Sequence, residues 1–142
     1  MILAYLDTCV WCRPFDDQMQ SRICNETAAF YEIALRADIR EIEILCSSAL
    51  TAEIEDISDE NKRENVRLLV IRGSTKSVEL DEVVKELAKD IEEKCGTSGG
   101  CAEYFITTDD KVLKKTKCIR NEFNIKVVNP IDFVREKYGI DI

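Results

Sequence analysis

A run of five apolar residues, Ile2 to Leu6, leads directly into a carboxylate, Asp7. A short apolar run without polar alternation is typical of a parallel strand that is buried on both faces. In an open α/β sheet, ligands bind beyond the carboxyl ends of the strands, near the point where the strand order reverses. The sequence therefore predicts that Asp7 lies at such a position, and it is the first candidate site residue.

The rest of the chain alternates between helical and strand patterns. Strands are predicted at residues 41–46, 77–80, 102–107 and 125–128, and helices at 18–37, after Ser47–Ser48, from Asp59 to Gly73, from Asp81 to Cys95, at 111–123 and after Asn129–Pro130. This alternation predicts one domain over residues 1–142, of the α/β class, with a mostly parallel sheet covered on both faces as a three-layer α/β/α sandwich. We expect the strands at 2–6 and 104–106 to be central and adjacent.

Composition excludes several classes of function. The formal net charge of −8 argues against a general polyanion-binding surface, so any contact with nucleic acid has to rest on local basic clusters. The chain contains no histidine, which removes the usual base for a cysteine nucleophile and most structural zinc sites. No apolar run approaches the roughly 20 residues of a membrane span, and the first residues do not resemble a signal peptide, so a cytoplasmic protein without a membrane partner is expected.

Three carboxylates follow or face predicted strand ends. Asp7 and Asp109 come directly after strands, and Glu53 lies at the rim of an apolar arc formed by Leu50 and Ile57, so its carboxylate is expected to point toward the strand ends and away from solvent. Converging carboxylates repel one another unless a cation is present, and an oxygen-only ligand set suits Mg²⁺ or Mn²⁺. Two alternatives remain open at this point: the aspartates serve as helix caps, and Glu53 is a solvated flank residue.

Four segments in this order resemble the PIN-domain family, a family of metal-dependent ribonucleases that includes toxins of toxin–antitoxin pairs. They are Tyr5–Val10 with Arg13–Asp17, Ser47–Ser48 leading to Glu53, Phe105–Asp110, and Val127–Pro130. The resemblance extends over nearly the whole chain. It implies a PIN-like α/β/α fold and an endoribonuclease that hydrolyses phosphodiester bonds with Mg²⁺ or Mn²⁺. RNA would then be the substrate, and a protein antitoxin and a second copy of the chain would be possible partners.

The same resemblance assigns roles to individual residues. Asp7, Glu53 and Asp109 match the acidic metal-binding positions, which are also the catalytic ones. Asp110 matches an accessory acid, and Thr8 and Thr107 match positions that orient the carboxylates. A weaker expectation is that basic residues near these acids contact the RNA backbone: Arg13, Lys111, Lys114 and Lys115. A solvated helix face explains the lysines equally well.

One departure from the family bears on activity. PIN proteins of this type carry an extra acid-bearing helix where this chain has only the connection Gly96–Gly100, between Cys95 and Cys101. Loss of that helix would expose Leu87 and Ile91, so we predict that it is present in the real polypeptide. A chain that truly lacks it would be a catalytically impaired PIN-like module for binding or dimerisation, which is the alternative function.

Overall fold

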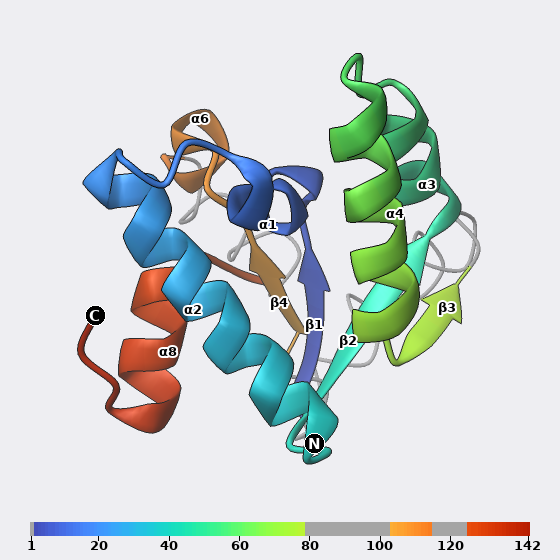
Figure 1. Ribbon diagram of the computed structural model, residues 1–142. Helices are drawn as coiled ribbons and strands as arrows, with labels where there is room; N and C mark the ends of the chain where they lie inside the picture. The colour runs from blue at the N-terminus through green and yellow to red at the C-terminus, as the bar shows by residue number, and fades with distance from the viewer. Residues whose placement is uncertain (1, 79–102, 115–124) are drawn as a thin grey trace.

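The computed structural model describes residues 2–78, 103–114 and 125–142 (Figure 1). Within these ranges five strands form one parallel sheet in the order β3-β2-β1-β4-β5. The strands are β1 (Ile2–Leu6), β2 (Ile42–Ser47), β3 (Lys76–Val78), β4 (Glu103–Ile106) and β5 (Lys126–Val128). The sheet places the two most apolar predicted strands, β1 and β4, side by side, as expected.

The strand order reverses between β1 and β4. From β1 the chain adds β2 and then β3 on one side, and it later returns to the other side of β1 to add β4 and β5. The register pairs Leu6 with Ile106, so the residues that follow these two strands leave the sheet at the same edge. This edge is the topological switch point at which α/β sheets bind ligands.

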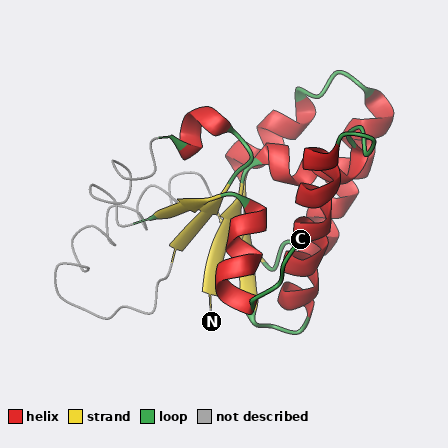
Figure 2. Cartoon of the chain, turned by 90° about the vertical axis from the view of Figure 1, so that its left-hand side faces the viewer, coloured by secondary structure: helices red, strands yellow, loops and turns green. Residues whose placement is uncertain are grey.

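The described helices gather mostly on one side of the strands (Figure 2). They are α1 (Thr8–Cys12), α2 (Ser21–Asp38), α3 (Ser48–Glu55), α4 (Glu60–Gly73), α6 (Asp110–Leu113) and α8 (Pro130–Tyr138), with a 3-10 turn, η1, at Arg13–Phe15. In Figure 1, α2 crosses in front of the sheet and lies beside α8. No helix in the described ranges is both long and apolar enough to cross a bilayer.

Alternate residues of the central strands form the core with these helices. Ala4 and Leu6 of β1 are fully buried and belong to the same cluster as Phe30 and Ile33 of α2 and Phe133 of α8. The intervening Tyr5 belongs to the opposite set of side chains, and its ring stacks on Phe105 at a centroid distance of 5.7 Å. On α2, Tyr31 follows the buried Phe30 and is itself 55% exposed.

Helix α1 was not predicted, because a helix of five residues is too short to show an apolar period. It places Trp11 in the core, fully buried and edge-on to Phe30. The packing of Trp11 also explains Gly73 at the end of α4. A Cβ atom at Gly73 would lie 3.0 Å from the Trp11 ring, so glycine permits the close approach of α4.

The predicted start of the last helix, after Asn129–Pro130, is confirmed. The Asn129 side chain caps α8 by accepting a hydrogen bond from Ile131 N, and Pro130 occupies the first turn. Gly139 follows the helix with φ 64, a left-handed conformation that glycine adopts without steric cost.

The observed architecture confirms the predicted α/β class, and it is consistent with the three-layer α/β/α sandwich. Several predicted segments lie outside the described residues: the helix at 81–95, the connection at 96–100 and most of the helix at 111–123. The segment between Cys95 and Cys101 is also outside the described residues, so the additional acid-bearing helix stays a prediction.

A pH dependence follows from the buried thiol of α1. Burial raises the pKa of Cys12 from its ordinary 9.0 to about 11. The Cys12 thiol therefore keeps its proton to a higher pH in the folded state than in the unfolded state. The resulting contribution to stability is fully present below pH 9 and is lost as the pH rises through 11. Between these pH values we expect the free energy of unfolding to fall by about 2 kcal/mol more for the wild type than for Cys12→Ala. Urea denaturation at both pH values measures this difference, and equal losses would contradict it.

Candidate functional site

Asp7 lies at the carboxyl end of β1 and caps α1. Its N–H donates to the Ile106 carbonyl at 2.9 Å, which extends the pairing of β1 with β4 by one residue. Its carboxylate is held at both oxygens: Oδ1 accepts from Thr8 N at 2.9 Å, and Oδ2 accepts from the Thr107 hydroxyl at 2.8 Å. The carboxylate therefore has a fixed orientation at the edge where the strand order reverses.

Thr107 connects this aspartate to the end of β4. The residue is fully buried, and its hydroxyl oxygen accepts from Asp109 N at 3.1 Å while the hydroxyl donates to Asp7. Asp109 itself is exposed and caps α6, because its Oδ1 accepts from Lys111 N at 2.9 Å. One buried hydroxyl thus joins the Asp7 carboxylate to the backbone of Asp109.

Glu53 joins the same group of residues from α3. Its Oε2 accepts a hydrogen bond from the Thr8 hydroxyl, so Thr8 contacts Asp7 through its backbone and Glu53 through its side chain. The expectation that Glu53 points toward the strand ends agrees with this contact. The expectation that it turns away from solvent is wrong, because Glu53 is exposed.

The negative charge of this region acts on Tyr5. The Tyr5 hydroxyl lies 2.8 Å from the Ser47 hydroxyl, which also caps α3. Burial raises the pKa of Tyr5, and the nearby carboxylates of Glu53 and Asp7 raise the pKa further. Asp7 and Glu53 are linked directly through Thr8, which donates to both carboxylates.

The donor chemistry of the predicted set fits a hard cation. Its atoms are carboxylate and hydroxyl oxygens, which Mg²⁺ and Mn²⁺ prefer. A carboxylate oxygen that accepts one hydrogen bond retains a second lone pair for a metal ion. Within the described ranges, however, no group of three or more acidic, cysteine or histidine side chains is close enough to hold a metal ion. The acids share an edge of the sheet, and their side chains would have to converge around an ion.

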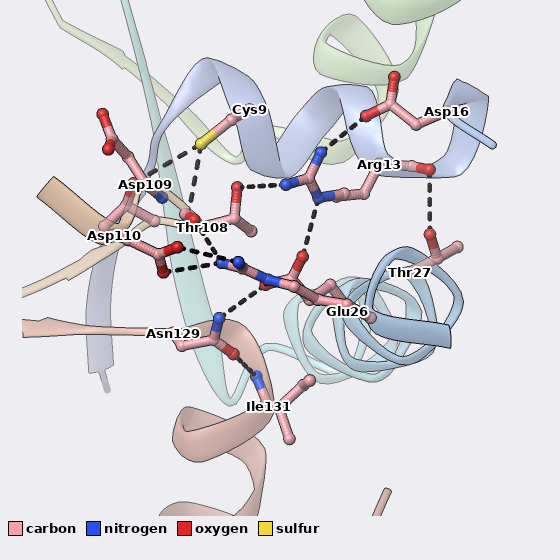
Figure 3. A network of polar contacts seen from close by, with 12 residues as sticks. Cys9, Arg13, Asp16, Glu26, Thr27, Thr108, Asp109, Asp110, Asn129 and Ile131 are labelled. Atoms are coloured by element: carbon pink, nitrogen blue, oxygen red, sulfur yellow. Dashed lines mark hydrogen bonds and ion pairs between the residues drawn. The ribbon is translucent and has the colours of Figure 1, made fainter. Parts of the chain in front are cut away.

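A fully buried carboxylate, Glu26 of α2, lies next to this region and was not among the predicted site residues (Figure 3). It accepts from Arg13 Nε at 2.9 Å, from Arg22 Nε at 3.4 Å and from Asn129 Nδ2 at 2.7 Å. The spacing of α2 carried a signal for it. Glu26 occurs four and seven residues before the buried Phe30 and Ile33, so it lies on the buried face of the helix.

Both arginines extend this network to the end of β4. Arg13 donates to the Thr108 hydroxyl at 3.1 Å and to Asp16 at 2.9 Å. Arg22 donates to the Thr108 carbonyl at 2.8 Å. The three partners of Arg13 and its 19% side-chain exposure favour a structural role over the predicted contact with RNA.

The remaining predicted residues lie on or after α6. Asp110 accepts two hydrogen bonds from Arg22, which lower the pKa of its carboxyl group. Lys111 and Lys114 are exposed close to Asp109, and Lys115 lies outside the described residues. Of the predicted basic set, the structure therefore places two lysines next to the acidic edge.

The chain was compared with protein-family models, with curated proteins and with solved structures. No family model matches it. No curated protein and no solved structure gives a significant match. The assignment of function therefore rests on the residues and geometry of the chain itself.

The buried network predicts that alanine substitutions of two glutamates of α2 lower the free energy of unfolding by very different amounts. Glu26→Ala leaves Arg13 and Arg22 without their buried partner and should lower the free energy of unfolding by about 3–5 kcal/mol. Glu32→Ala is the matched control on the same helix, because it removes a partly exposed pair with Arg36 and should cost less than about 1 kcal/mol. Chemical denaturation of both variants measures the two values. Similar losses would show that Glu26 does not organise this region.

Proposed function

We propose that the protein is a Mg²⁺- or Mn²⁺-dependent endoribonuclease that hydrolyses phosphodiester bonds. One observation carries the proposal: Asp7 and Asp109 follow the two adjacent strands at which the strand order reverses, and Thr107 joins them by hydrogen bonds. An α/β sheet offers its ligand site at this point. The resemblance of the sequence segments to PIN-domain ribonucleases supplies the substrate class.

In this proposal Asp7, Glu53 and Asp109 hold the ion. When bound, the ion would lower the pKa of a water molecule to make the attacking hydroxide, and would stabilise charge on the phosphate. Thr107 and Thr8 orient the ligands: Thr107 donates to Asp7, and Thr8 donates to both Asp7 and Glu53. Ligands fixed in this way lose little conformational freedom when the ion binds.

In this proposal Lys111 and Lys114, which are exposed close to Asp109, contact the RNA backbone. The resemblance also extends the proposal to a toxin of a toxin–antitoxin pair that acts in the cytoplasm, with an antitoxin or a second copy of the chain as protein partner. These partners are proposed on the resemblance alone.

A second candidate is a PIN-like binding or dimerisation module without catalysis. The observation that favours it is that Asp7 and Asp109 serve as helix caps, while the described residues contain no preformed cluster of three metal-binding side chains. A module of this kind would bind RNA or protein and would leave RNA intact with or without Mn²⁺.

Cleavage of single-stranded RNA with and without Mn²⁺ tests the proposal. Asp7→Asn keeps a good capping residue but removes a charged ligand, and should lower the Mn²⁺-dependent rate more than 100-fold. Thr107→Val removes the hydroxyl that orients Asp7 and accepts from Asp109 N, and should lower the rate about 10- to 100-fold.

Asp59→Asn is the matched control for Asp7→Asn. Asp59 is likewise the N-cap residue of its helix, α4, with Oδ1 accepting from Lys62 N at 3.1 Å, and it has no part in the proposed site. This variant should retain the wild-type rate. Full activity of Asp7→Asn would refute the assignment of the site, and absence of cleavage by the wild type would favour the binding module.

A further inference from the structure

Arg22 and Asp110 form a two-pronged ion pair beside the acidic edge. Arg22 Nη1 lies 3.0 Å from Asp110 Oδ2, and Arg22 Nη2 lies 2.9 Å from Asp110 Oδ1. The two side chains are 50% and 63% exposed, so solvent reaches the contact. A phosphate has two free oxygens in a similar arrangement, and arginine binds carboxylates and phosphates through the same fork.

The guanidinium of Arg22 is also held by two contacts that do not involve Asp110. Its Nε faces the buried Glu26 at 3.4 Å, and Nη2 also donates to the Thr108 carbonyl at 2.8 Å. Glu26 is in turn held by Arg13 and Asn129, so the Nε end of the Arg22 guanidinium is anchored to the network in Figure 3. If Asp110 moved away, one N–H on each Nη would become available while these two anchors remained.

The position of this fork matters because the neighbouring residues repel a polyanion. Asp110 directly follows Asp109, and consecutive Cα atoms are about 3.8 Å apart. A nucleic-acid strand that approaches Asp109 meets several carboxylates on a chain with a net charge of −8. A local cation with its donors already oriented would offset that repulsion where the strand enters.

We propose that Arg22 is a phosphate-binding residue for the nucleic-acid strand, and that Asp110 occupies its fork until a phosphate of the strand displaces it. This inference rests on the proposed function, since it places the phosphate next to the one that would be cleaved. It changes the role of Asp110 from an accessory acid to a competitor of the substrate.

A purely structural ion pair makes a different prediction. If Arg22 and Asp110 only position the turn after β4, removal of either partner disturbs the same contact, and both substitutions weaken the binding of RNA. If Asp110 competes with phosphate, the two substitutions have effects of opposite sign.

Fluorescence anisotropy with a labelled single-stranded RNA measures these effects on the full chain. EDTA in the buffer withholds divalent ions and so prevents cleavage. Asp110→Asn should bind RNA about 2- to 5-fold more tightly than the wild type, because the exposed pair no longer has to be broken. Arg22→Gln should bind about 5- to 10-fold more weakly, and the slope of log affinity against log salt should fall by about 0.7, as for one lost phosphate contact on a single strand.

The pair of Arg36 and Glu41 provides controls of matched charge. Arg36 belongs to the same helix and donates to Glu41 at 3.2 Å, just before β2 and thus at the opposite edge of the sheet. Arg36→Gln and Glu41→Gln change the net charge as the two test variants do, and both should shift the affinity less than 2-fold.

Three results would overturn the inference alone: weaker binding by Asp110→Asn, an affinity of Asp110→Asn equal to that of Glu41→Gln, or an affinity of Arg22→Gln equal to that of Arg36→Gln. In each case the wild type still binds RNA, and the proposed function stands. A wild type that does not bind RNA at low salt would overturn the inference together with the proposed function.

Discussion

The hydrogen bond from the buried Thr107 hydroxyl to Asp7 joins the ends of the two central strands, and the rest of the acidic edge depends on it. Parallel pairing of β1 with β4 brings both chain segments to one edge, but pairing alone does not orient a carboxylate. The Thr107 hydroxyl orients one, and its oxygen also receives the N–H of Asp109. A valine at this position would keep the shape of the side chain, yet it would leave the N–H of Asp109 without its acceptor.

Glu26 stabilises the same edge from the helical layer. A buried carboxylate is costly unless charged partners and hydrogen bonds compensate for its lost hydration. Arg13 and Arg22 provide the charge, and both arginines also reach Thr108. The buried charge therefore fixes the turn that follows β4, in which Thr107 and Asp109 lie. Since Asn129 both caps α8 and donates to Glu26, the start of α8 is held by the same carboxylate.

The sequence predicted those features that depend on local patterns. Apolar runs identified the central strands, and the Asn129–Pro130 pair identified the start of α8, because capping is decided within a few residues. That Asp7 and Asp109 share an edge was also predictable, since the carboxyl ends of adjacent parallel strands lie together.

Features that depend on tertiary contacts were not predictable. The short helix α1 is too brief to show a period, and its orientation is set by the burial of Trp11. The partners of Glu26 come from three different segments, so the sequence could indicate a buried charge but not which residues neutralise it. For the same reason the sequence did not indicate that Arg13 contacts Glu26, Asp16 and Thr108 within the protein.

Titration calorimetry with Mn²⁺ tests most directly whether the acids at the strand ends hold a divalent ion. The full chain should bind Mn²⁺, and Asp109→Asn should abolish the binding or weaken it at least 10-fold, because asparagine still caps α6 but has lost the ligand charge. Asp59→Asn should bind as the wild type does. Mn²⁺ affinity that is unchanged in Asp109→Asn, or no heat of binding in the wild type, would contradict the account.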